Sequence, residues 1–178
     1  MKRLYLVTLL GVAGCNKEPA QAVGTEARAL VPGTDLQVSD IEAAEYSLQF
    51  VEQTVGPFRF TGRKWSDPPN QTTVHLIKTL TGDLDGDHKG DGVAVIAANF
   101  GGTGTFVSVI PVLNREGKAL PGRGTPLGDR TQVEQISLKG DTVVVGLIAA
   151  GPSDPACCPS DSVTQRFHLV GDSLALLP

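Results

Sequence analysis

Apolar and polar residues alternate over residues 72–80, and this pattern predicts a β-strand. Val74, Leu76 and Leu80 fall on one face of such a strand, and Ile77 falls on the other. A period of two is typical of a strand with one buried face and one face that is more exposed to water.

An unbroken apolar run follows at residues 93–98, bounded by Gly92 and Asn99. Because both of its faces are apolar, it predicts a central strand that is buried on both sides. Residues 105–113 predict the next strand. Pro111 places the far end of that strand at a sheet edge or a bulge, since proline has no N–H for the ladder.

Three turn sequences predict β-hairpins in the rest of the chain. Residues 114–117 would close a hairpin after the strand at 105–113. Gly140-Asp141 separates residues 136–139 from 142–148, and Gly171-Asp172 separates residues 167–170 from 173–177. Glycine–aspartate pairs supply the positive φ that tight hairpin turns require.

The segment before residue 61 predicts one short helix and two strands. Residues 39–42 have the sequence of a capping box, with Ser39 as the N-cap and Glu42 reaching back to it. The helix would be short because residues 46–51 resemble a strand. Residues 55–60 predict an edge strand, since they contain Pro57.

No later segment has a helical period, and there is no internal repeat. The sequence therefore predicts a mainly β fold over residues 39–178. This would be a single antiparallel β domain, a sandwich or a partly open barrel, with one short N-terminal helix.

The N-terminus has the layout of an export signal. Lys2 and Arg3 precede an apolar segment at residues 4–13, which is shorter than the ~20 residues of a membrane-spanning helix. Small residues then precede Cys15, and this arrangement resembles the lipobox of bacterial lipoproteins. An ordinary signal peptide and a buried N-terminal strand are the alternatives. The resemblance implies a signal peptide at residues 1–14 and a lipidated cysteine at the mature N-terminus.

Residues 15–38 then predict a flexible tether, because they are polar and rich in helix-breaking residues. Acyl chains such as palmitate on Cys15 would hold the protein on a bacterial membrane, with its domain facing the periplasm or the exterior. The net charge is −4, and removing Lys2 and Arg3 would bring it to about −6. An acidic chain without a basic patch argues against nucleic acid as a partner.

The chain has three cysteines, and lipidation of Cys15 would leave Cys157 and Cys158. These adjacent residues could form a vicinal disulfide, remain free thiols or bond to another chain. An oxidising compartment favours disulfides. We expect the vicinal disulfide, acting as a conformational clip in a turn that Pro155 and Pro159 stiffen.

Residues 82–92 form an acidic loop, and they contain the clearest candidate chemistry in the chain. Carboxylates fall at loop positions 1, 3, 5 and 9, and position 7 would contribute a backbone carbonyl. A hard cation such as Ca²⁺ takes six to eight oxygen ligands. The sequence therefore predicts a calcium site, with the solvated acidic turn as the alternative. The predicted metal ligands are Asp83, Asp85, Asp87, Lys89 and Asp91.

This spacing resembles the calcium loops of FG-GAP repeats and, more distantly, EF-hand and dockerin loops. Two positions differ from those families. His88 stands at position 6, where glycine is usual, so it must accept a left-handed conformation or the turn must differ. Ala94 stands at position 12, so no bidentate glutamate closes the site. Both differences predict weak affinity, about 10⁻⁴–10⁻³ M.

Over most of the mature domain the chain resembles a group of small bacterial lipoproteins. The shared elements, in order, are the acidic loop, the apolar strand, a glycine-rich turn, a Leu-Gly-Asp-Arg step and a Cys-Cys-Pro turn. Here they stand at residues 82–91, 93–99, 101–106, 127–130 and 151–159. The resemblance implies no particular activity.

Enzyme chemistry finds little support in the sequence. Ser153, Ser160 and Ser162 lack the context of a nucleophile elbow, and the three histidines are scattered. We therefore expect a non-enzymatic envelope module that binds an envelope protein or a cell-wall partner. The alternatives are a metal-dependent hydrolase that uses the Asp83–Asp91 cluster and a periplasmic inhibitor or chaperone.

Overall fold

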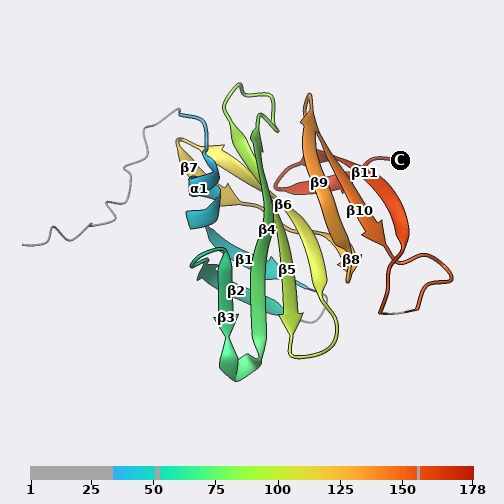
Figure 1. Cartoon of the computed structure of the whole chain (residues 1–178). Helices are drawn as coiled ribbons and strands as arrows, with labels where there is room; N and C mark the ends of the chain where they lie inside the picture. The colour runs from blue at the N-terminus through green and yellow to red at the C-terminus, as the bar shows by residue number, and fades with distance from the viewer. Residues whose placement is uncertain (1–33, 51–52, 156) are drawn as a thin grey trace, which may run out of the picture.

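The computed structural model describes residues 34–178 except 51, 52 and 156 (Figure 1). The predicted signal peptide, Cys15 and most of the predicted tether lie outside the described residues. The elements, in chain order, are α1 (Val38–Ala43), β1 (Glu45–Gln49), β2 (Thr54–Arg59), β3 (Lys64–Asp67), the 3₁₀ turn η1 (Pro68–Asn70), β4 (Thr72–Gly82), β5 (Asp91–Phe100), β6 (Phe106–Arg115), β7 (Lys118–Pro121), β8 (Thr125–Asp129), β9 (Gln132–Lys139), β10 (Thr142–Ala149), β11 (Asp161–Val170) and β12 (Ser173–Leu176).

The strands form three antiparallel sheets. The largest has the order β3-β4-β5-β6-β7, with β8 also paired to β6, and the second has the order β12-β11-β10-β9. β1 and β2 form a two-stranded sheet of their own. The predicted mainly β, antiparallel fold with one short α-helix is confirmed.

The large sheet is the middle layer, and its two faces bury two separate hydrophobic clusters (Figure 1). Ala94, Ile96 and Ala98 of β5 pack with α1, β1 and β2 on one face. Val93 and Val95 pack against the second sheet on the other face. The prediction of a central strand buried on both sides is confirmed.

β4 contains a register shift that the alternation did not reveal. Val74 and Leu76 lie in the first cluster, as expected, whereas Leu80 packs against the second cluster. The pairing of β4 with β5 shifts between Leu76 and Lys78. An extra residue in one strand reverses the faces of all residues beyond it. The prediction that Leu80 shares a face with Val74 was therefore wrong.

Pro111 also lies in a different setting from the predicted one. It stands inside β6, which pairs with β5 on one side and with β7 and β8 on the other. Its carbonyl oxygen accepts a hydrogen bond from the N–H of Gly122, at 2.8 Å, where β7 has ended and β8 has not begun. The N and O of a strand residue face the same side, so the missing N–H of Pro111 falls at this junction.

The N-cap of the helix lies two residues before the predicted N-cap Ser39. Gln37 is the N-cap of α1, and its N–H donates to Oδ2 of Asp40, at 2.8 Å. Gln37 and Asp40 have the same three-residue separation as Ser39 and Glu42, although the local sequence pattern favours Ser39 and Glu42. Glu42 forms an ion pair with Arg63 instead.

The predicted hairpins are present. Glu116-Gly117, Gly140-Asp141 and Gly171-Asp172 connect β6 to β7, β9 to β10, and β11 to β12. Both Glu116 and Gly117 have positive φ. β2, which contains Pro57, pairs only with β1, as expected of an edge strand.

The folded part of the chain reaches into the predicted tether, because Leu36 is 2 % exposed and belongs to the first cluster. Among the described residues, no helix has the length and apolar character needed to cross a bilayer.

Removing the side chain of Leu147 tests the second cluster. Leu147 of β10 is fully buried, so Leu147→Ala should lower the free energy of unfolding by about 2–5 kcal/mol. Leu176→Ala is the matched control because Leu176 is 56 % exposed, and it should change the value by no more than about 0.5 kcal/mol. Urea denaturation measures both. Similar losses in the two variants would contradict the packing of β10 on the large sheet.

Candidate metal centre

The acidic loop connects β4 to β5 at one end of the large sheet, next to the start of the described chain (Figure 1). Gly86 and His88 turn the loop, with φ of 77° and 64°. His88 therefore adopts the left-handed conformation, which was one of the two alternatives predicted for its position in the loop. Its side chain is 96 % exposed.

Three of the predicted ligands lie together in the structure. Asp83, Asp85 and Asp91 each offer one carboxylate oxygen, and these oxygens lie within 4.8 Å of one another. A group of this kind could hold a metal ion, since a cation would remove the repulsion between neighbouring carboxylates.

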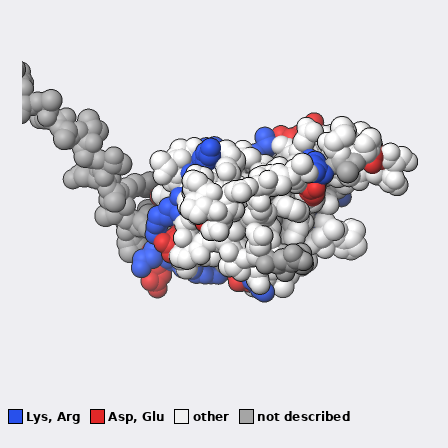
Figure 2. Space-filling view, turned by 90° about the horizontal axis from the view of Figure 1, so that it is seen from below, with Lys and Arg blue, Asp and Glu red and all other residues white. Residues whose placement is uncertain are grey.

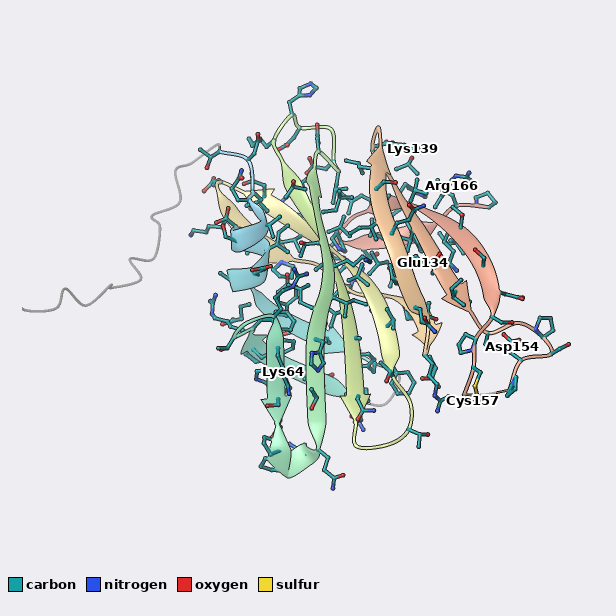
Figure 3. All side chains as sticks on the ribbon, viewed as in Figure 1. Lys64, Glu134, Lys139, Asp154, Cys157 and Arg166 are labelled. Carbon is teal, nitrogen blue, oxygen red and sulfur yellow. A yellow bond between two sulfur atoms is a disulfide. The ribbon has the colours of Figure 1, made fainter. Side chains whose placement is uncertain are left out.

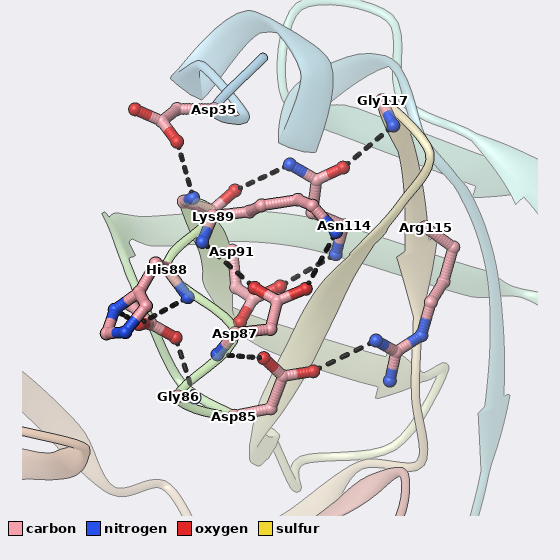
Figure 4. A network of polar contacts seen from close by, with 12 residues as sticks. Asp35, Asp85, Gly86, Asp87, His88, Lys89, Asp91, Asn114, Arg115 and Gly117 are labelled. Atoms are coloured by element: carbon pink, nitrogen blue, oxygen red, sulfur yellow. Dashed lines mark hydrogen bonds and ion pairs between the residues drawn. The ribbon is translucent and has the colours of Figure 1, made fainter. Parts of the chain in front are cut away.

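Each of the six oxygens in this group already accepts one hydrogen bond (Figure 4). The N–H groups of Gly86 and His88 donate to Asp83. Asp85 accepts from the N–H of Asp87 and from Arg115. A carboxylate oxygen has two lone pairs, so each oxygen retains one for a cation.

Asp91 is the buried member of the group, at 1 % exposed. Its Oδ2 accepts from the N–H of Leu84 at 2.9 Å, and its Oδ1 accepts from the N–H of Asn114 at 2.7 Å. Burial raises the pKa of Asp91 despite these two hydrogen bonds, and the charges of Asp85 and Asp87 add to the rise. Because the pKa of Asp91 is higher in the folded chain than in the unfolded chain, the free energy of unfolding falls as pH rises through that pKa. A bound cation would lower the pKa of Asp91 and so reverse this pH dependence.

The Lys89 carbonyl stays a predicted ligand, whereas Asp87 lies outside the group of three carboxylates. Asp87 bonds to Lys89 instead, whose ammonium lies 3.0 Å from Oδ2 of Asp87. This hydrogen bond is the largest cause of the lowered pKa of Asp87. The Lys89 ammonium therefore forms an ion pair with the neighbouring carboxylate at the surface of the loop.

Arg115 is a functional residue that the sequence did not indicate. It stands at the end of β6, and its guanidinium NH1 lies 2.9 Å from Oδ2 of Asp85. The two residues are separated by 30 positions, so only the pairing of β5 with β6 brings them together. Arg115 therefore competes with any cation for Asp85.

The start of the described chain also bonds to the loop. The N–H of Gly90 donates to Oδ1 of Asp35 at 2.6 Å, and the N–H of Leu36 donates to the carbonyl of Gly90 at 2.9 Å. Asn114 joins these segments, because its side-chain amide donates to the carbonyls of Thr34 and Gly90. The sequence indicated only a turn residue at Asn114.

A cleft of about 370 Å³ lies beside the acidic loop. Asp85, Gly86 and Arg115 form one side of it, and the second sheet forms the other, through Asp141 in a turn and His168 of β11. The candidate centre is therefore open to solvent on the side of Asp85.

Cys157 and Cys158 are joined by a disulfide in the loop between β10 and β11, as expected (Figure 3). Asp154 organises this loop by accepting hydrogen bonds from the N–H groups of Gly151 and Ser160, which lower its pKa. The disulfide lies away from the acidic loop, at the other end of the molecule.

The chain was compared with known proteins. No protein-family model, no curated protein and no solved structure matches it. The fold and the site geometry are therefore the basis of any functional proposal.

Replacing Asp91 tests the buried carboxylate. In Asp91→Asn, the side-chain NH₂ group must face the N–H of Leu84 or of Asn114, so one buried hydrogen bond is lost. We expect the free energy of unfolding to fall by about 1–3 kcal/mol. The control is Asp87→Asn, which keeps an acceptor for the N–H of Lys89 and should change stability little. Thermal denaturation at pH 7 measures both, and equal melting temperatures would contradict the role of Asp91.

Proposed function

We propose that this protein is a lipid-tethered module of the bacterial cell envelope that binds a partner without catalysis. Its acidic loop binds Ca²⁺, and the ion stiffens the junction between tether and domain. Cys15 carries the lipid, and residues 16–33 span the distance from the membrane surface.

The observation that carries this proposal is the attachment of residues 34–36 to the acidic loop. The backbone of Leu36 and the carboxylate of Asp35 both bond to Gly90, which immediately precedes Asp91. A cation held by Asp83, Asp85 and Asp91 would reduce the motion of the loop, and with it the motion of the point where the tether enters the domain. Force applied through the tether would act on this junction first.

The donor set favours Ca²⁺ over softer metals. All available donors in the group are oxygens, and hard cations prefer oxygen ligands. Three carboxylates cannot supply six to eight ligands by themselves, so waters would complete the shell. The lack of a bidentate glutamate at position 12 and the competition from Arg115 both favour low affinity. A site of about 10⁻⁴–10⁻³ M would fill outside the cytosol, as in extracellular modules.

The end of the domain that faces away from the acidic loop is available to a partner. It includes the turn η1 and the loop at residues 101–104, where Asn99 bonds to the carbonyls of Gly102 and Gly104. Figure 2 shows that charged side chains lie mostly toward the rim of this end and that its middle is uncharged. The uncharged middle favours a partner contact that does not depend on charge.

A metal-dependent hydrolase is the second candidate, and the cleft beside Asp85 is the observation that favours it. A substrate in this cleft would reach an ion on the Asp83, Asp85 and Asp91 group. Arg115 already neutralises Asp85 there, which weakens the site as a centre for activating water. Turnover that follows added Mg²⁺ or Mn²⁺ would favour the hydrolase over the binding module.

Lipidation can be tested by fractionation. Changing Cys15→Ser removes the only acceptor in the lipobox, so the protein should move from the membrane fraction to the soluble fraction. Radiolabelled palmitate should enter the original chain and be absent from the variant. Cys157→Ser is the matched control and should leave the protein on the membrane. Membrane retention of Cys15→Ser would contradict the tether.

Calcium binding can be tested by thermal denaturation. Millimolar Ca²⁺ should raise the melting temperature, because an ion that binds only the folded state stabilises it. Asp85→Asn should abolish this rise. Asp67→Asn, which removes the same charge at the opposite end of the sheet, should retain it.

Arg115→Gln should strengthen the calcium stabilisation that Asp85→Asn abolishes, in the same thermal denaturation experiment. It removes the competitor for Asp85, so half-maximal stabilisation should occur at a Ca²⁺ concentration roughly two- to fivefold lower, as expected for an exposed ion pair. An unchanged melting curve for the original chain at millimolar Ca²⁺ would overturn the metal site and leave the tether proposal to the fractionation experiment.

A further inference from the structure

The loop that joins β10 to β11 carries the disulfide between Cys157 and Cys158. Figure 3 shows Cys157 on the part of this loop that extends beyond the ends of the two strands. Both cysteines are exposed to solvent. The disulfide is therefore accessible to other molecules, unlike one that is buried between two sheets.

The fold closes this loop without help from the disulfide. At the base of the loop, Ala149 of β10 pairs with Asp161 of β11. Beyond this pair, Asp154 accepts hydrogen bonds from the N–H groups of Gly151 and Ser160, at 2.9 and 2.7 Å, and from the hydroxyl of Ser160, at 2.8 Å. These contacts join the two ends of the loop, and no cysteine takes part in them.

A disulfide between adjacent residues also adds little to the stability of the domain. In the chain-entropy account, a cross-link stabilises mainly by restricting the unfolded chain, and its effect grows with the number of residues that it encloses. Cys157 and Cys158 are neighbours in the sequence, so their bond encloses no further residue. The bond can therefore be broken without opening the fold.

We propose that the Cys157–Cys158 disulfide is a redox site that exchanges electrons with a dithiol protein of the cell envelope. Two observations carry this inference: both cysteines are exposed, and the loop is closed by other contacts. Exposed disulfides are the ones that thiols reduce readily, whereas structural disulfides resist reduction.

The exchange has two steps, and each step forms one S–S bond and breaks one. A thiolate of the dithiol partner attacks one sulfur of the pair, which forms a mixed disulfide and releases the other cysteine as a thiolate. The second thiolate of the partner then attacks the mixed disulfide and releases the remaining cysteine. The partner loses two electrons and becomes a disulfide. Cys157 and Cys158 gain these electrons and take up the two protons that the partner's thiols lost.

Reduction would change the loop only locally. The N–H of Cys158 donates to the carbonyl of Pro155 at 2.9 Å, so the disulfide lies within a turn. Without the S–S bond the backbone of this turn regains rotational freedom, while Asp154 still holds the ends of the loop together. A protein that contacts the turn would therefore meet a different surface in each redox state.

This inference takes the envelope location from the proposed function, but it goes beyond the calcium site and does not depend on it. The disulfide and the acidic loop lie at opposite ends of the molecule. A pair that resists reduction would leave the calcium and fractionation experiments unaffected. A chain that fails the fractionation experiment could still have a reducible pair, with its partner in another compartment.

Mass spectrometry can read the state of the pair directly. Residues 140–166 form one tryptic peptide whose only cysteines are Cys157 and Cys158, so Cys15 does not interfere. The full chain in detergent micelles is equilibrated with about 5 mM reduced glutathione and a roughly tenfold lower concentration of its disulfide, a poise close to that of an oxidising compartment. Free thiols are then blocked with N-ethylmaleimide before digestion.

We expect more than half of this peptide to have lost its internal disulfide. Ribonuclease A in the same buffer is the control, and its structural disulfides should remain intact. The inference is overturned if most of the peptide keeps the Cys157–Cys158 bond.

Melting temperatures distinguish a redox site from a structural cross-link. Reduction with dithiothreitol should change the melting temperature by less than about 2 °C, and so should the double variant Cys157→Ser/Cys158→Ser. Asp154→Ala removes the hydrogen bonds that hold the loop together and should lower the melting temperature by about 2–4 °C. If reduction lowered it more than Asp154→Ala does, the disulfide would be the contact that closes the loop, and the inference would be wrong.

Discussion

The burial of β5 on both faces is the constraint on which the rest of the structure depends. Alternate side chains of this strand contribute to two hydrophobic clusters, so the large sheet must be covered on each side. One cover is the second sheet, and the other is α1 with β1 and β2. Because apolar burial is the main favourable term in folding, this strand fixes the position of the two loops that join its ends. The acidic loop enters β5 at Asp91, and this first residue of the strand is therefore drawn into the protein with its carboxylate.

A buried carboxylate beside two others is an electrostatic cost that the fold has only partly offset. Hydrogen bonds from Leu84 and Asn114 hold Asp91 in place, yet its pKa remains raised. The remaining lone pairs of the three carboxylates could hold a cation. The same loop holds Asp35 and Leu36, so an ion there would act on the junction with the tether. Stability, metal binding and attachment to the membrane would then share one set of contacts.

The proposed roles occupy separate parts of the surface. Residues 34–36 and the acidic loop meet at one end of the large sheet, and the glycine-rich loop at residues 101–104 lies at the other (Figure 1). If the proposed roles are correct, this separation would leave the domain free to contact a partner while the protein stays attached to the membrane.

The sequence by itself determined the features that arise within a few residues of one another. The hairpin turns and the two-sided strand at residues 93–98 follow from local pattern. The same kind of pattern gave a left-handed His88 and a Cys157–Cys158 disulfide as one alternative each. Only the tertiary structure decided which neighbours meet across strands. The bulge in β4 reversed the face of Leu80, and the pairing of β5 with β6 brought Arg115 to Asp85. The predicted metal ligands divide in the same way, since their spacing pointed to all four aspartates but could not show that Lys89 would pair with Asp87. Register and long-range charge pairing depend on contacts between distant segments, and no local pattern encodes those contacts.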